Sequence, residues 1–237
     1  IWKMRPVIRE SSEIQSLTES AMWDDVSILA ARPPKNPVDT RRPYAHLVEP
    51  ECAASGKIED VATIFLTNRE CPLRCLMCDL WKNTTDERVP VGAIREQIAF
   101  ALADLPPAKH IKLYNSGNFF DRQAIPRDDH QAIADCVVAF ETVIVENHPQ
   151  LCGDDCLRFR NLLAGKLEIA LGLETIHPEV LPRLNKQMTT DDFRRAVRFL
   201  SDQQLVVVEL LHHLARAFDE LDALLDAGVD HVEIGRR

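Results

Sequence analysis

The chain has 237 residues, 46% of them hydrophobic and 27% charged, with a formal net charge of −9. This length suits one large domain or two small ones, and the composition is ordinary for a globular protein. The acidic total argues against a broadly basic nucleic-acid-binding surface, although it leaves room for a local basic groove. No apolar stretch is long enough to span a bilayer, and residues 1–6 lack the plan of a secretory signal, so a cytoplasmic protein with no membrane partner is expected.

Residues 1–60 are predicted to form an N-terminal extension to a main domain that covers residues 61–237. A helix fits within residues 10–31, and the proline-rich run at 32–37 then breaks regular structure. The stretch at 41–44 continues as extended chain or loop. We expect a strap packed on the main domain, with a substrate-binding arm as the alternative.

From residue 61 onward, short apolar or β-branched runs alternate with stretches of helical spacing. The predicted strands are residues 61–67, 109–115, 142–147, 167–173, 205–211 and 229–234. The predicted helices are marked by apolar residues on one face: Ile94 to Leu105 after Pro90, Ile133 to Phe140 after Asp129, Phe193 to Leu200 after Thr190, and Leu214 to Leu225 before Gly228.

This alternation predicts an α/β fold in which parallel strands are joined by helical crossovers. Six such units with the helices outside form a partial (β/α)6 barrel related to the TIM barrel. The chain ends directly after the sixth strand, so a last helix and any C-terminal domain are expected to be missing from it. In this architecture the functional residues lie at the carboxyl ends of the strands.

Three cysteines follow the first predicted strand of this domain. Cys71, Cys75 and Cys78 have the spacing C-x3-C-x2-C. Three thiolates bind an iron–sulfur cube while leaving one iron free for another ligand, whereas a closed zinc site fills four positions. A zinc knuckle with a fourth ligand elsewhere, or three unremarkable thiols, are the alternatives. The odd total of seven cysteines also favours reduced thiols in a reducing cytosol.

The cysteine run resembles the signature of the radical S-adenosylmethionine (SAM) superfamily, including the apolar Met77 before the last cysteine. The resemblance implies a [4Fe-4S] cluster on the three cysteines and SAM bound at the free iron. It also implies an external electron donor and reductive cleavage of SAM to a 5′-deoxyadenosyl radical, which abstracts a hydrogen from a substrate. The implied fold is the same partial barrel, with the cluster on the loop after the first strand.

The second and third strands end in candidate SAM contacts. Asn115, Ser116 and Gly117 occupy the place where the family usually has a Gly-Gly-Glu-like turn that binds the SAM amino group, although the tripeptide is also an ordinary turn. Glu146 closes an apolar strand and is expected to point into the barrel mouth, because a buried carboxylate needs a partner; a surface acid is the alternative. His148 precedes Pro149 and is expected in a loop.

The fourth strand ends in Gly-Leu-Glu and is followed by an Asn-Lys turn, as in several radical SAM subfamilies. By that resemblance Glu174 is a candidate for the ribose hydroxyls, since a carboxylate accepts from two donors at once. Lys186 is a candidate for the SAM carboxylate or a substrate anion, with a solvated cation as the alternative. Cys152 and Cys156 form a second C-x3-C, but too few ligands accompany them to predict an auxiliary cluster.

The runs at residues 65–72, 78–83, 113–121 and 143–146 together resemble the Elp3/MiaB-like radical SAM group. Within that group they resemble the radical SAM subunit of archaeosine synthase, which acts as a lyase on a modified deazaguanine in tRNA. The resemblance therefore implies tRNA as a substrate. A small molecule or peptide substrate, and a non-catalytic metal-binding protein, are the alternatives.

Overall fold

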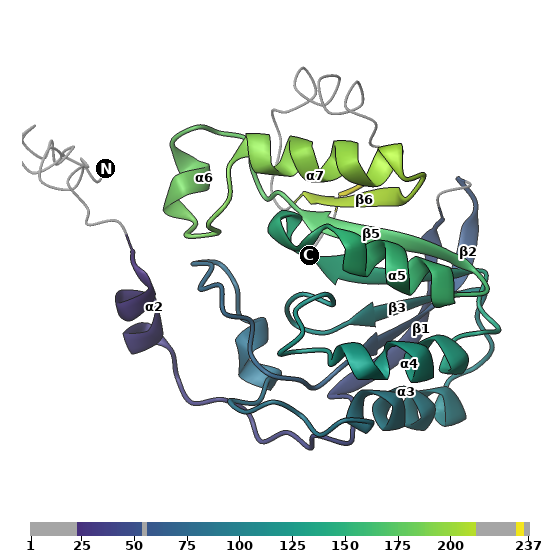
Figure 1. The fold of residues 1–237 in the computed structure, drawn as a ribbon. Coiled ribbons are helices and arrows are strands. Elements are labelled where there is room, and N and C mark those ends of the chain that lie inside the picture. The colour runs from purple at the N-terminus through teal and green to yellow at the C-terminus, as the bar shows by residue number, and fades with distance from the viewer. Residues whose placement is uncertain (1–22, 54–55, 212–230, 235–237) are drawn as a thin grey trace, which may run out of the picture.

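The structure is a computed structural model that describes residues 23–53, 56–211 and 231–234 (Figure 1). Its centre is a seven-stranded sheet whose spatial order follows the chain order. The strands are β1 (Ala45–Cys52), β2 (Ile58–Phe65), β3 (His110–Tyr114), β4 (Thr142–Asn147), β5 (Lys166–Gly172), β6 (Val206–Leu211) and β7 (His231–Ile234). Strands β2 to β7 are parallel to one another, and β1 pairs antiparallel with β2.

Helices cover one face of the curved sheet (Figure 1). The helical segments are α2 (Asp25–Ala31), η1 (Leu80–Asn83), α3 (Ala93–Asp104), η2 (Arg127–Asp129), α4 (His130–Cys136), η3 (Pro149–Leu151), α5 (Asp154–Leu162), α6 (Val180–Arg183) and α7 (Thr190–Asp202). The predicted α/β partial barrel of parallel strands is confirmed. None of the described helices is long and apolar enough to cross a membrane.

The main core lies between the helices and the outward-facing residues of the strands. Ile64, Ile111 and Ile169 are fully buried there, and Ile94 of α3 packs in the same cluster. Alternate strand residues face the other way and form the barrel interior, where Ile144 and Ala170 make a second, smaller cluster. The period-2 alternation thus separates a helix-packed face from an interior that leads up to the cavity.

Helices α3 and α7 match their predicted positions closely. The face of α3 that begins at Ile94 is buried as expected. Helix α7 begins at Thr190, because Thr189 caps it in a capping box with Asp192: each side chain bonds the backbone N–H of the other. Such reciprocal capping satisfies two amide groups that have no partner within the helix.

Three differences from the predicted elements have physical causes. Strand β2 begins at Ile58 rather than residue 61, because β1 pairs along its whole length. Helix α4 ends at Cys136, before Phe140, where two consecutive β-branched valines follow and have lower helix propensity. Helix α5 was not predicted, because only Cys156 and Phe159 of it are buried and its apolar period is weak.

The N-terminal segment behaves as a strap on the main domain from Arg32 to Tyr44. Arg41 pairs with Glu96 of α3 through Nη1 and Oε2 at 2.5 Å, and the Asn36 amide donates to the Lys82 carbonyl at 2.8 Å. Strand β1 lies within the predicted extension yet belongs to the same sheet, while the boundary at residue 60 stays a prediction. The last predicted helix, from Leu214 to Leu225, lies outside the described residues.

Candidate functional site

The loop that carries the cysteines begins where the end of β2 is fixed by helix α3. The buried Gln97 side chain accepts from the Thr67 amide at 2.8 Å and donates to the Thr67 carbonyl at 2.7 Å. Gln97 Nε2 also donates to the Thr40 carbonyl of the strap, at 2.8 Å. Residues 71–78, called the cysteine loop below, therefore leave the sheet from a rigid point.

The cysteine loop borders a cavity of about 300 Å³ at the carboxyl ends of the parallel strands. The structure brings nine of the ten predicted site residues to its lining: Cys71, Cys75, Cys78, Met77, Ser116, Gly117, Glu146, Glu174 and Lys186. The tenth, Asn115, is fully buried beside the cavity, and neither its Oδ1 nor its Nδ2 has a hydrogen-bond partner in the described part of the chain. The sequence thus located the cavity, although the roles of these residues stay predictions.

The three cysteines of the loop are free thiols, and Cys71 and Cys78 are close enough to influence the pKa of Cys75. Burial raises the pKa of Cys71 and of Cys78. It also raises the pKa of Cys75 to about 11, and the charges of the Cys78 and Cys71 thiolates add to that rise. Asn118 donates through Nδ2 to Cys71 Sγ at 3.2 Å. Thiols in such a place need a compensating positive charge to ionise, and a bound metal is the usual source of one.

Gly117 lets the turn after β3 approach the cysteine loop closely. A Cβ at this position would lie 3.1 Å from the Cβ of Cys71, tighter than ordinary van der Waals contact. Its neighbour Ser116 has a left-handed φ of 52° and is held by a 2.9 Å hydrogen bond between its Oγ and the Tyr44 hydroxyl. The strap therefore supports a turn of the cavity wall in a conformation that non-glycine residues seldom adopt.

Glu146 presents an unsatisfied carboxyl group to the cavity. Its Oε2 is buried and has no hydrogen-bond partner among the described residues. Burial raises the pKa of Glu146 to about 7, and the hydrogen bond from the Asn115 backbone N–H and the charges of Lys186 and Lys112 only partly oppose that rise. A half-protonated carboxyl with a spare oxygen is suited to accept from an ammonium or hydroxyl group of a ligand.

Glu174 and Lys186 are paired with each other. Lys186 Nζ lies 2.8 Å from Glu174 Oε1, and the side chains are 11% and 12% exposed. A Cβ at Gly172 would lie 2.8 Å from Lys186 Nζ, so glycine makes room for the pair. Glu174 Oε2 has no partner in the described structure and is free to accept from a ligand.

His148 is a cavity residue that the sequence assigned only to a loop. It is buried, caps η3, and accepts at Nδ1 from the Gln150 amide at 3.3 Å. Burial lowers its pKa to about 4, so the ring is neutral and its Nε2–H donates to the Lys186 carbonyl at 3.1 Å. His148 therefore fixes the backbone of the loop that carries Lys186. Its place directly after the buried strand β4 is the sequence signal that could have identified it as a cavity residue.

The second cysteine pair adjoins a residue of the cavity lining. Cys152 and Cys156 are free thiols, and Asn147, which lines the cavity, points its Nδ2 to Cys152 Sγ at 3.5 Å. Across the described residues, no group of three or more His, Cys, Asp or Glu side chains is arranged to hold a single metal ion. The expectation that this pair holds no auxiliary cluster stays a prediction.

Backbone strain is concentrated around the cavity. Of the five non-glycine residues with left-handed φ in the described chain, four lie on loops that form its rim: Ser116, Glu174, Asn185 and Gln187. Such conformations cost on the order of 1–3 kcal/mol each and persist where surrounding contacts enforce them. Asn185, for example, donates through Nδ2 to the Arg74 carbonyl of the cysteine loop at 2.9 Å.

Comparison with known proteins relates the chain to solved structures alone. No family model and no curated protein matches it. Its fold is similar to that of SuiB from Streptococcus suis, with a TM-score of 0.50 and 13% identity over 68% of this chain and 35% of that chain. The chain therefore spans about a third of the length of that structure.

Two further solved structures show a weaker likeness. One is OxsB, a cobalamin-dependent S-adenosylmethionine radical enzyme, with a TM-score of 0.45 and 18% identity over 68% of this chain and 26% of that chain. The other is the radical S-adenosylmethionine methyltransferase TsrM from Kitasatospora setae, with a TM-score of 0.46 and 16% identity over 73% of this chain and 35% of that chain. At these identities the comparisons establish a shared fold with SuiB and nothing about chemistry.

Proposed function

We propose that the chain is a radical SAM enzyme whose cysteine loop holds a [4Fe-4S] cluster and whose cavity binds SAM. The observation that carries the proposal is the convergence of three free thiols and an unsatisfied carboxyl on one cavity at the carboxyl ends of parallel strands. Functional sites of barrel folds lie at this end. The cysteine spacing provides three ligands and leaves one iron for SAM.

The residues present fit such a cluster. A cube binds one thiolate per iron, so its cysteines do not have to converge on a single ion. When bound, the cluster would supply the electron that cleaves SAM to methionine and a 5′-deoxyadenosyl radical able to abstract a substrate hydrogen. Asn118 would donate to the sulfur of Cys71, as it does in the structure.

The remaining cavity residues are proposed to bind and orient SAM. The spare oxygens of Glu146 and Glu174 provide acceptors for the amino group and the ribose hydroxyls. Lys186, already paired with Glu174, provides a cation for a carboxylate. Met77 is 43% exposed at the cavity mouth and provides apolar surface, and the close approach at Gly117 brings backbone groups to the ligand.

Anaerobic reconstitution with iron and sulfide tests this proposal. The protein should turn brown, show the electron paramagnetic resonance signal of a reduced [4Fe-4S] cluster, and release 5′-deoxyadenosine from SAM with an external reductant. Cys75→Ala should abolish that release, and the matched control Cys136→Ala, a half-buried cysteine outside the cavity, should not. Colourless parent protein, zinc at the three thiols, or full activity of Cys75→Ala would each refute the proposal.

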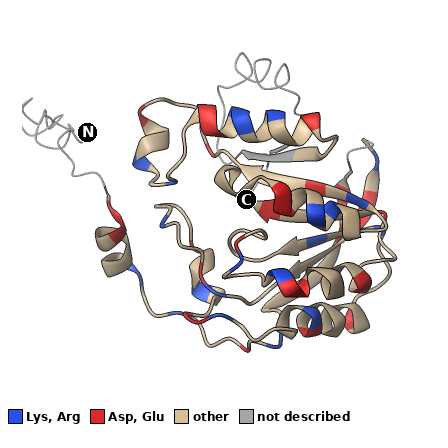
Figure 2. Ribbon diagram, viewed as in Figure 1, with Lys and Arg blue, Asp and Glu red and all other residues tan. Residues whose placement is uncertain are grey.

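The substrate is proposed to be tRNA, on the resemblance to the Elp3/MiaB-like group and the archaeosine synthase subunit. The surface gives this proposal little support, since cations and acids are interspersed on the outer helices (Figure 2). On α7, for example, Arg194 pairs with Asp191 at 2.6 Å. The net charge of −9 favours the second candidate, a small molecule or peptide.

Salt dependence of tRNA binding separates the two substrates. Phosphate contacts make affinity fall steeply as salt rises, so a steep slope would support tRNA and undetectable binding at low salt would favour the alternative. An oxygen-sensitive cluster on reduced thiolates also fits a reducing compartment, and we therefore propose a cytoplasmic location.

A further inference from the structure

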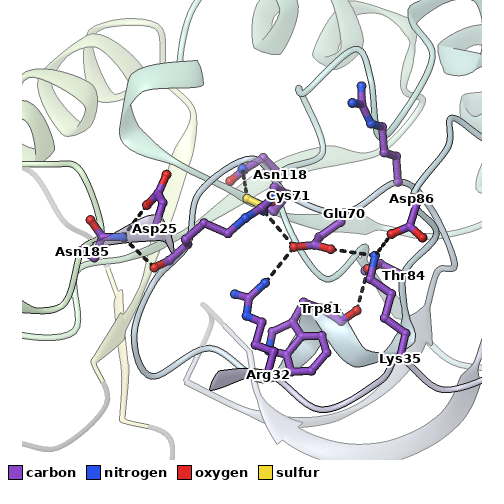
Figure 3. A network of polar contacts seen from close by, with 12 residues as sticks. Asp25, Arg32, Lys35, Glu70, Cys71, Trp81, Thr84, Asp86, Asn118 and Asn185 are labelled. Carbon is purple, nitrogen blue, oxygen red and sulfur yellow. Dashed lines mark hydrogen bonds and ion pairs between the residues drawn. The ribbon is translucent and has the colours of Figure 1, made fainter. Parts of the chain in front are cut away.

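A network of charged side chains joins the strap to the start of the cysteine loop (Figure 3). Its centre is the carboxylate of Glu70, which is 12% exposed and directly precedes Cys71. Arg32 Nη1 and Arg74 Nη1 each lie 2.8 Å from Glu70 Oε1, and Lys35 Nζ lies 2.6 Å from Oε2. Partly buried charge-assisted pairs of this kind restrict motion more than exposed ones do.

Arg32 also reaches the other end of the cysteine loop. Its guanidinium carbon lies 4.7 Å from the ring centroid of Trp81, and its side chain is 10% exposed. Trp81 is buried, follows Cys78 by three residues, and its carbonyl accepts from Thr84 Oγ1 at 2.6 Å. A guanidinium can form an ion pair at its edge while it stacks on an aromatic face, so one side chain holds both ends of the loop.

The strap is attached to the same region by further bonds beyond Arg32. Asn36 donates from its amide to the Lys82 carbonyl and from Nδ2 to Asn83 Oδ1, both at 2.8 Å. Lys35 bridges Glu70 to Asp86, with 2.6 Å between Lys35 Nζ and Asp86 Oδ1. The strap therefore follows the chain on both sides of the cysteine loop.

The cysteine loop has few backbone hydrogen bonds. Within residues 71–78, the backbone bonds that the structure describes include one turn bond, from Cys78 N to Cys75 O at 3.2 Å, and one from Leu76 N to Leu184 O at 2.9 Å. Side chains add to these, since Arg74 Nη1 donates to the Cys71 carbonyl and Asn185 Nδ2 donates to the Arg74 carbonyl. A segment with few backbone bonds opens locally at low free energy unless side chains restrain it.

We propose that Arg32 is a positioning residue for the cluster-binding loop: its ion pair to Glu70 and its stacking on Trp81 hold the two ends of residues 71–78 at a fixed separation. The strap then presets the spacing of the thiols before iron arrives. The proposal rests on the proposed function only in that the loop holds a cluster, since the restraint itself belongs to the metal-free protein. Arg32 is not among the residues that line the cavity, although its charge partly opposes the rise that burial causes in the pKa of Cys78.

Hydrogen–deuterium exchange of the metal-free protein tests the restraint directly. Arg32→Ala should increase exchange across residues 70–84 by roughly tenfold, the size expected when one charge-assisted hydrogen bond that restrains a segment is lost. Arg32→Lys keeps the positive charge but loses the planar guanidinium that stacks on Trp81, so it should restore only part of the protection from exchange. Arg41→Ala is the matched control, because it breaks another strap ion pair, to Glu96, away from the loop.

The reconstituted protein gives the second measurement. Arg32→Ala should lose iron to a chelator roughly tenfold faster than the parent, in line with its exchange rate, and broaden the electron paramagnetic resonance signal of the reduced cluster, while Arg41→Ala matches the parent. Unchanged exchange over residues 70–84 in Arg32→Ala would overturn the proposal, as would equal effects of the two alanine variants. Parent protein that takes up no iron would refute the proposed function while leaving the exchange result to decide the restraint.

Discussion

Replacing the cavity residue Glu146 with Gln should remove a decrease in the free energy of unfolding that the parent protein shows as pH rises. Burial raises the pKa of this carboxyl from 4.5 to about 7. A group whose folded pKa is raised contributes its stability fully below the unfolded value, and that contribution is lost as pH rises through the folded value. Gln keeps the shape of the side chain without a charge, so the variant should lack this loss.

The magnitude follows from the size of the shift. A rise from 4.5 to about 7 is about 2.5 units, at about 1.36 kcal/mol per unit, so complete ionisation of Glu146 lowers the free energy of unfolding by about 3 kcal/mol. Most of that loss, about 2.5 kcal/mol, falls between pH 5 and pH 8. Because the residue as a whole is only half-buried, solvent screening reduces the figure, and we expect about 1–2.5 kcal/mol.

Urea unfolding of the metal-free parent and Glu146→Gln at about pH 5 and about pH 8 measures the effect. The variant should gain stability relative to the parent by the stated amount as pH rises, because all other titrating groups are common to both proteins. Glu87→Gln, which changes an exposed carboxylate, serves as the control and should show no such gain. A difference between parent and Glu146→Gln that stays constant with pH would refute the reasoning.

Three further predictions concern the cavity and its supports. Lys186→Met should lower the free energy of unfolding by about 2–4 kcal/mol, because it leaves Glu174 without its cation, and the double variant with Glu174→Gln should recover most of that loss in urea unfolding. Gly117→Ala should lower the iron content after reconstitution without changing the melting temperature by more than a few degrees, since the new Cβ would lie 3.1 Å from Cys71 Cβ; an unchanged iron content would contradict this. Thr189→Ala should cost about 1 kcal/mol in urea unfolding through loss of the capping box and should leave iron content unchanged.

The sequence predicted the parts of the fold that depend on local periodicity. The strand at 142–147 coincides with β4, and the buried face that begins at Ile94 coincides with α3. The cysteine spacing and the strand ends located the cavity, since parallel strands place their carboxyl ends at one edge. The position of the cavity was therefore predictable from the sequence, while the chemical roles of its residues stay predictions.

The features that the sequence did not predict depend on contacts between residues far apart in the chain. Strand β1 contains Pro50 between two glutamates and does not alternate clearly, so only its pairing with β2 defines it. Gln97 anchors the end of β2 from 30 residues away, and Arg32 meets Glu70 across 38 residues. A polar residue on a helix or in a proline-rich run gives no sign of such a partner until the chain is folded.

The antiparallel strand β1 also determines how the protein can be shortened. It covers the β2 side of the sheet with a strand that carries Pro50, which lacks an N–H, and flanking glutamates, features that discourage lateral association. A fragment starting at residue 61 would uncover the N–H and C=O groups along β2, in which Val61, Ala62 and Ile64 are buried apolar residues. Such a fragment would aggregate through strand addition, so the smallest soluble version of this barrel has to begin before Ala45.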